Sequence, residues 1–213
     1  SAREFYIFME EAAGSSYFED LNAIRARGRL LDEDLNRVRI LARLLEKLHA
    51  QTYKGDDAKT LYRRRIRELI GHGECVMGII DEYGPVSFAR EEEWIRYAEK
   101  CMAWWGKTRD RCERLCRVHG DFHPGNILFQ GKEPLLMDCS RGRWGEAADD
   151  VSCLAVNFIW YALKDGGGFQ GPFAELFHDF LGAYLQLTGD RGILELCPPF
   201  IAFRILVVAN PRF

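Results

Sequence analysis

Apolar residues follow a helical spacing over most of this 213-residue chain. Before His49 they recur three or four positions apart, which predicts an amphipathic helix over residues 34–49. Similar patterns predict a mostly helical stretch over residues 61–83, with a weak point at Gly71 and Gly73. Further helices are expected over residues 91–105, 108–116, 150–163, 172–187 and 199–208.

Three short apolar runs do not follow this spacing. Residues 127–129 and 135–137 flank a segment that contains Gly131 and Pro134, which predicts a β-hairpin with a five-residue connection over residues 130–134. Residues 5–9 are rich in aromatic and β-branched side chains and indicate a strand, which we expect to break at residues 14–16. The predicted fold class is therefore mainly α, with one small hairpin in its middle.

Composition narrows the classes of function. The chain has 29 basic and 32 acidic residues, and this balance argues against a nucleic-acid partner, which needs a basic face. No apolar run approaches the ~20 residues of a membrane span, so no membrane partner is expected. Seven cysteines, an odd number scattered through helical sequence, indicate a reducing, cytoplasmic compartment.

Candidate catalytic residues are concentrated in one loop, His119-Gly120-Asp121-Phe122-His123-Pro124-Gly125-Asn126, and in Asp138 after the predicted hairpin. Phosphoryl transfer needs a carboxylate that orients the attacking hydroxyl and accepts its proton, and hard oxygen ligands for Mg²⁺. Asp121 fits the first role, and Asn126 and Asp138 fit the second. Four residues separate Asp121 from Asn126, as in a kinase catalytic loop. The hairpin should return the chain so that Asp138 lies beside Asn126.

The two histidines of this loop admit a second interpretation. His119-x-Asp121-x-His123 could be a transition-metal cluster of a hydrolase, which would need further ligands from a chain that has five histidines in all. Such a site would hold Zn²⁺ or Mn²⁺ without nucleotide, whereas a kinase site would hold Mg²⁺ with it. Both histidines are candidate catalytic residues. We expect His119 to hydrogen-bond the loop backbone, and His123 to support the loop or lie near the substrate.

The segment from His119 to Asn126 resembles the catalytic loop of aminoglycoside phosphotransferases and choline-kinase-like enzymes. Leu136-Met137-Asp138 resembles their metal-binding segment, with Cys139-Ser140 where protein kinases carry Phe-Gly. The resemblance implies the C-terminal lobe of a protein-kinase-like fold. It also implies transfer of the γ-phosphoryl group of ATP (GTP is possible) to a hydroxyl of a small-molecule acceptor, with Mg²⁺. Asp121 would be the base, and Asn126 and Asp138 the metal ligands.

Three further segments extend the resemblance. Asp149-Asp150-Val151 resembles the start of the next helix, where Asp150 would brace the catalytic loop through backbone N–H groups. Residues 8–14 are similar to the strand and hinge between the kinase lobes, where the backbone around Glu10, Glu11 and Ala13 would bind adenine. Residues 44–49 are similar to the first C-lobe helix of the family, which commonly ends in Leu-His. His49 itself is interpreted as a packing or surface residue.

The resemblance divides the chain into residues 1–14, the end of an N-lobe strand and the hinge, and residues 15–213, a helical catalytic C-lobe. The phosphate-covering loop and lysine of the family's N-lobe have no counterpart before Phe5. We therefore expect a piece of a longer kinase that needs the missing N-lobe and turns over little alone. The alternative is a non-catalytic pseudokinase, nucleotide-binding or scaffold module. The acceptor pocket is expected between helices in residues 50–110 and after residue 155.

Overall fold

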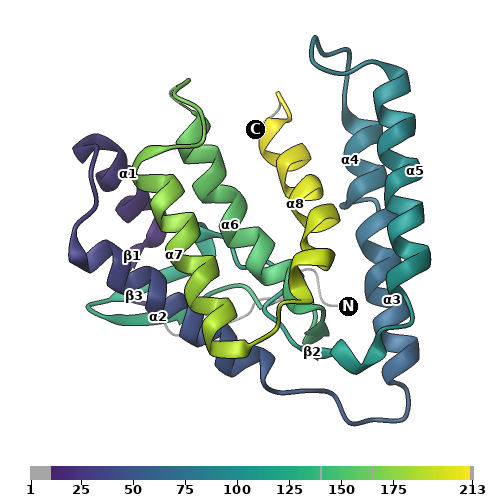
Figure 1. The fold of residues 1–213 in the computed structure, drawn as a ribbon, viewed down its shortest axis with the longest axis horizontal. Coiled ribbons are helices and arrows are strands. Elements are labelled where there is room, and N and C mark those ends of the chain that lie inside the picture. Colours follow the sequence, from purple (N-terminus) through teal and green to yellow (C-terminus); the bar gives the residue numbers. More distant parts are fainter. Residues whose placement is uncertain (1–10, 140, 165, 212–213) are drawn as a thin grey trace, which may run out of the picture.

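Eight α-helices form most of the described structure, with short strands along one side (Figure 1). The computed structural model describes residues 11–139, 141–164 and 166–211. The helices are α1 (Tyr17–Arg27), α2 (Asp32–His49), α3 (Ala58–Gly71), α4 (Val76–Glu82), α5 (Glu91–Thr108), α6 (Ala147–Leu163), α7 (Gly171–Thr188) and α8 (Ile193–Ala209). The mainly helical fold class is confirmed.

Helix α6 is the centre of the core. Every residue from 147 to 158 is buried, so this helix is enclosed on all sides, as its almost continuously apolar sequence requires. It packs against α7 and α8, and α7 packs in turn against α2. Helix α2 instead buries one face, through Val38, Leu41 and Leu45, which is the amphipathic pattern that the sequence predicts.

Helices α3, α4 and α5 form a second group on the far side of α8 (Figure 1). The weak point at Gly71 and Gly73 is the gap between α3 and α4. Helix α8 contacts both α4 and α5, so it lies between this group and the core helix α6. No helix in the described residues is long and apolar enough to cross a membrane.

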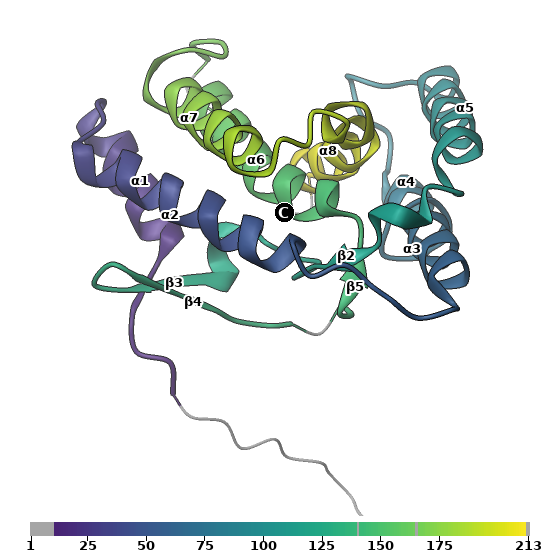
Figure 2. The ribbon, with the colours of Figure 1, turned by 60° about the horizontal axis from the view of Figure 1, so that its bottom comes forward.

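The predicted hairpin is present, with a shorter connection than expected. Strands β3 (Ile127–Gln130) and β4 (Glu133–Leu136) are antiparallel and lie beneath the helices in Figure 2. Gln130 pairs with Glu133, so two residues connect the strands rather than five. Gly131 has a φ of 63°, which a two-residue turn needs and which glycine adopts without steric cost.

The N-terminal end of the described chain differs from the prediction. Ser15 and Ser16, expected to break a strand, form β1 (Ser15–Ser16), which pairs with β3. The unpredicted helix α1 follows at once, and the Ser16 hydroxyl accepts the N–H of Phe18 at 3.3 Å as its N-cap. The strand predicted over residues 5–9 lies outside the described residues.

The prediction of a helix over residues 108–116 is wrong. Helix α5 continues to Thr108, and the chain then forms a short 3₁₀ turn, η1 (Cys112–Arg114), and β2 (Cys116–Arg117), which pairs with β5 (Trp144–Gly145). Backbone hydrogen bonds with residues far away in the sequence favour an extended conformation of residues 115–117. Leu115 O accepts the N–H of Tyr53, and the N–H of Arg117 donates to Gln51 O, each at 2.9 Å. Local spacing carries no information about such partners.

Candidate active site

The predicted catalytic loop leaves β2 and ends at β3, with the turn η2 (Pro124–Asn126) before the hairpin. Asp150, in the first turn of α6, lies behind it and is fully buried. Its two carboxylate oxygens accept the backbone N–H groups of His119 and Gly120, both at 2.7 Å. This is the bracing geometry that the resemblance implies for Asp150. The loop is thus attached to the most deeply buried helix of the molecule.

The contacts of Asp150 also set its charge. Burial by itself raises the pKa of Asp150, but the hydrogen bond from His49 and those from His119 and Gly120 outweigh it. The pKa therefore lies below its ordinary value, and the group is ionised at neutral pH. His49 Nε2 lies 3.2 Å from Asp150 Oδ2, and His49 Nδ1 lies 2.8 Å from the hydroxyl of Tyr184 on α7. His49 is buried and connects α2, α6 and α7.

His119 contacts backbone with both ring nitrogens. Nε2 donates to Met137 O at 2.8 Å, and Nδ1 accepts the N–H of Asp121 at 3.2 Å. The side chain is buried and joins the catalytic loop to the end of the hairpin. This agrees with the expectation that His119 hydrogen-bonds the loop backbone.

Asn126 and Asp138 lie at the same end of the hairpin. Asn126 precedes β3, Asp138 follows β4 by two residues, and Met137 N–H donates to Asn126 O at 2.9 Å. The amide Nδ2 of Asn126 donates to Asp121 O at 3.0 Å. Among the described residues Asp138 is the one non-glycine with positive φ, 53°. Such conformations gather at functional sites.

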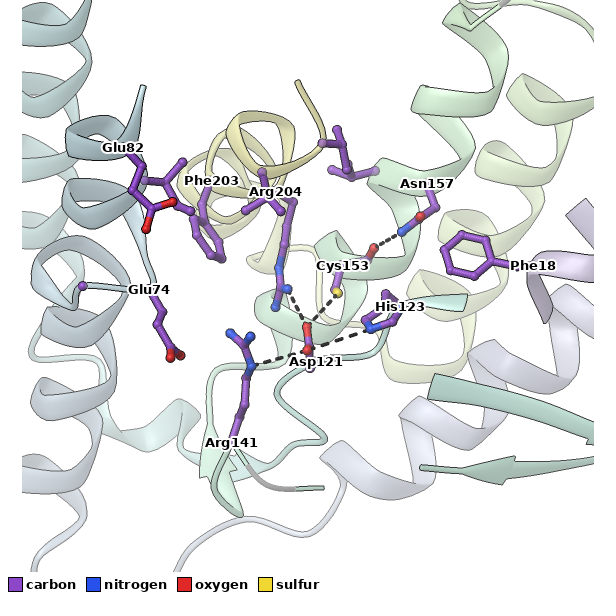
Figure 3. Close-up of a pocket in the computed structure, with 15 residues that line it drawn as sticks. Phe18, Glu74, Glu82, Asp121, His123, Arg141, Cys153, Asn157, Phe203 and Arg204 are labelled. Atoms are coloured by element: carbon purple, nitrogen blue, oxygen red, sulfur yellow. Dashed lines mark hydrogen bonds and ion pairs between the residues drawn. The ribbon is translucent and has the colours of Figure 1, made fainter. Parts of the chain in front are cut away.

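Asp121 lies at one end of a cavity of about 510 Å³ (Figure 3). Its Oδ1 is 2.6 Å from Nη1 of Arg204 on α8, and its Oδ2 is 3.3 Å from Nε of Arg141. The cavity is lined on one side by Glu74 and Glu82 and on the other by Asn157 and by Phe18 of α1, among other residues. The helices predicted to form an acceptor pocket, in residues 50–110 and after residue 155, both line it; the contribution of α1 was not predicted.

His123 borders the same cavity; its backbone N–H donates to Asp121 O at 2.9 Å, but its ring makes no hydrogen bond to the Asp121 carboxylate. Its Nδ1 accepts the N–H of Gly125 at 3.0 Å, and its Nε2 lies 4.0 Å from Asp121 Oδ2. Burial lowers the pKa of His123, and the opposing attraction of Asp121 does not restore it, so the ring is neutral at pH 7. The hinge residues Glu11 and Ala13 precede β1, and Glu10 lies outside the described residues. Their contact with adenine stays a prediction.

Arg204, His49 and Tyr184 contribute to this site without having been predicted for it from the sequence. Arg204 is the one charged residue in the apolar stretch 201–209, and a lone arginine within a buried helix is a signal that it faces a carboxylate. His49 ends the helix that carries the Leu-His pattern, but its partners Asp150 and Tyr184 are 101 and 135 residues away. No local spacing could reveal those contacts.

Residues 8–195 match the model of the phosphotransferase enzyme family APH. The chain belongs to this family. No curated protein sequence matches it significantly. The match covers the catalytic loop, the hairpin and α6, so the family prediction made from the residues 119–126 and 138 is confirmed. It favours the kinase interpretation of the loop over the hydrolase one.

Solved structures place this family member in the kinase-like fold. One crystal form of a glucosamine kinase has a TM-score of 0.57 and 17% identity, covering 93% of this chain and 52% of that chain. A second form has a TM-score of 0.52 and 18% identity; the match covers 91% of this chain and 53% of that kinase. A complex of glucosamine kinase with glucosamine, ADP and inorganic phosphate has a TM-score of 0.50 and 19% identity, covering 91% and 54%. The shared fold is shown, and the chain spans about half the length of those kinases.

Proposed function

We propose that this phosphotransferase transfers the γ-phosphoryl group of ATP, or of GTP, to a hydroxyl of a small molecule bound in the cavity at Asp121. One observation supports this function best. A single loop, braced by a buried carboxylate, presents Asp121 to a cavity large enough for a sugar-sized molecule and places Asn126 beside the hairpin end that carries Asp138.

Asp121 is proposed as the base. Its carboxylate would accept a hydrogen bond from the acceptor hydroxyl, orient that oxygen toward the γ-phosphorus, and take the proton as the new P–O bond forms. The bond from the γ-phosphorus to the bridging oxygen breaks, and ADP leaves. The neutral ring of His123 would lie near the acceptor without adding charge.

The donor set of Asn126 and Asp138 fits Mg²⁺. An amide oxygen and a carboxylate are hard ligands, and Mg²⁺ commonly takes one or two such protein ligands together with phosphates and water. When bound, the ion would neutralise charge on the phosphates. The hydrogen bond from Asn126 Nδ2 to Asp121 O fixes the amide relative to the proposed base, so both functions depend on one loop conformation.

The rest of the nucleotide site is proposed to come from an N-lobe. The glucosamine kinases are about twice as long as the part of them that this chain matches. Phosphoryl transfer depends on groups that position the phosphates and stabilise their charge. The hinge around Glu10, Glu11 and Ala13 would bind adenine where the two lobes meet. We expect residues 1–213 alone to turn over little, and the full protein to be active. The seven free cysteines and the use of ATP favour a cytoplasmic location.

The acceptor class follows from the cavity. The lining is partly apolar, and away from Asp121 and its arginine partners Glu74, Glu82 and Asn157 add two carboxylates and an amide, so hydroxylated amines are the first compounds to test. The glucosamine bound in one structural neighbour makes an amino sugar a natural member of that panel. The panel should also contain amino alcohols, neutral sugars and aminoglycosides.

The test is acceptor-stimulated ADP release by the full-length protein with Mg²⁺–ATP. We expect stimulation by at least one panel member in the wild type, loss of that stimulation in Asp121→Asn, and normal stimulation in Asp179→Asn. Asp179 is a matched control, because its carboxylate pairs with Arg39 on the surface, between α2 and α7. Nucleotide binding without any stimulated release would favour the binding-module alternative.

A further inference from the structure

The two carboxylate oxygens of Asp121 have different surroundings. Oδ1 lies 2.6 Å from Arg204 Nη1 and 3.9 Å from the Cys153 sulfur, and both partners belong to buried parts of α8 and α6. Oδ2 lies near Arg141 and His123, whose side chains are 39% and 36% exposed. The partners of Oδ1 are therefore mostly buried side chains, whereas those of Oδ2 are more than a third exposed; Figure 3 shows all four around Asp121.

Arg204 is fixed from three directions. Besides Asp121, its Nη2 donates to Asp149 Oδ1 at 3.0 Å and to Gly120 O at 3.3 Å. The side chain is 11% exposed. Its Nε is fully enclosed and has no hydrogen-bond partner within the described part of the chain. Three of the five N–H groups of Arg204 are thus bonded within the protein and a fourth, on Nε, is enclosed, so most of this side chain is engaged with protein groups and not with a ligand.

Asp149 provides the second carboxylate for Arg204 and also contacts Arg65. Its Oδ2 lies 3.3 Å from Nη2 of Arg65 on α3, and Arg65 Nη1 donates to Arg141 O at 2.8 Å. Arg204 and Arg65, together with Arg141 at Asp121 Oδ2, thus face the carboxylates of Asp121 and Asp149 in a network that joins α3, α6, α8 and the catalytic loop. A buried charge is tolerated when it is paired in this way. Asp150 braces the loop backbone, and its neighbour Asp149 holds the arginine that contacts the loop's functional side chain.

We infer that Arg204 is a positioning residue for Asp121: it holds Oδ1 so that Oδ2 faces the acceptor hydroxyl, and Asp149 holds Arg204 in place. This inference rests on the proposed phosphotransferase function. It assigns proton acceptance to Oδ2 of Asp121. It also gives Asp149 a role distinct from that of Asp150, because Asp149 holds Arg204 whereas Asp150 braces the loop backbone. Because the effect acts through orientation, loss of Arg204 should slow turnover more than it weakens nucleotide binding.

The first experiment measures kcat and the KM values for ATP and for the acceptor in the full-length protein. Arg204→Met is expected to lower kcat by ~100-fold, the size of effect that misplaced reacting groups produce, with little change in the KM for ATP. Arg204→Lys keeps a charge near Oδ1 and should recover part of the loss. Arg39→Met, which removes a bidentate arginine–carboxylate pair far from the cavity, should leave kcat unchanged.

Misfolding of Arg204→Met is controlled by a second variant. Arg204→Met/Asp149→Asn removes both buried charges together, so its urea-unfolding midpoint should return toward that of the wild type while kcat stays low. Wild-type kcat in a folded double variant, or a raised acceptor KM with unchanged kcat in Arg204→Met, would overturn the positioning role. A wild type without acceptor-stimulated ADP release would overturn the proposed function and this inference together.

Discussion

The catalytic loop has two unlike faces. The buried face consists of Asp150, His49, Tyr184 and His119, and the contacts there are hydrogen bonds between buried groups, several of them to backbone. The cavity face consists of Asp121, Arg204, Arg141 and His123, and the contacts there are mostly between charges, some of them partly exposed. One face fixes where the loop lies, and the other surrounds the Asp121 carboxylate, which we propose as the base. Changes to the buried face should therefore act mainly on folding stability, and changes to the cavity face mainly on turnover.

The largest loss of stability should come from Asp150→Ala. The substitution leaves three buried donors without an acceptor, the N–H groups of His119 and Gly120 and His49 Nε2. Each costs roughly 1–3 kcal/mol, so unfolding free energy should fall by about 3 kcal/mol or more, measured by urea denaturation. Asp179→Ala, at a surface ion pair, should change it far less. Equal effects would contradict a bracing role.

The same residue gives a pH dependence with a defined sign. The pKa of Asp150 in the folded state lies below the ordinary value of about 3.9, so its stabilisation is complete above that pH and is lost as pH falls through the folded-state pKa. Unfolding free energies of the wild type and Asp150→Asn should therefore begin to converge as pH falls below about 4, the unfolded-state pKa, and continue to do so at lower pH. A constant difference over that range would show that the carboxylate charge is not the stabilising feature.

A smaller effect is expected from His49→Phe. Phenylalanine keeps an aromatic ring but removes the contacts with Asp150 and the Tyr184 hydroxyl, so stability should fall by roughly 1–3 kcal/mol. His178, exposed on α7, provides the matched control. Thermal unfolding of both variants tests this, and a His178→Phe change as large as that of His49→Phe would refute the bridging role of His49.

The smallest effect on stability, with the sharpest contrast in activity, should come from Gly120→Ala. Gly120 has a φ of 85°, and a methyl group there would lie 2.8 Å from Arg65 Nη2 and 3.2 Å from Arg141 Cβ. Gly131, with a φ of 63°, has nothing within 4 Å of the same position. Both alanine variants should lose about 1–2 kcal/mol, but Gly120→Ala alone should lower kcat, because it displaces Asp121. Equal kcat values would contradict this.

The sequence predicted part of each face and missed another part. Asp121, Asn126 and Asp138 are recognisable because their spacing along one loop and hairpin reflects a local geometry, and Asp150 because it starts the next helix. Arg204 reaches the loop from α8, and His49 of α2, itself bonded to Tyr184 of α7, reaches Asp150 behind the loop. No local pattern encodes contacts over such distances in sequence. Backbone pairing explains the remaining errors in the fold, since Leu115 and Arg117 bond to residues 51–53 rather than continuing a helix.

The central claim is that Asp121 is the base of a phosphotransferase. The most direct measurement is single-turnover transfer of ³²P from [γ-³²P]ATP to an active acceptor, in the full-length wild type and in Asp121→Asn, with nucleotide binding measured on the same samples. We expect a transfer rate about 10²- to 10⁴-fold lower in the variant, with unchanged affinity for Mg²⁺–ATP. Equal transfer rates in the two proteins would contradict the claim.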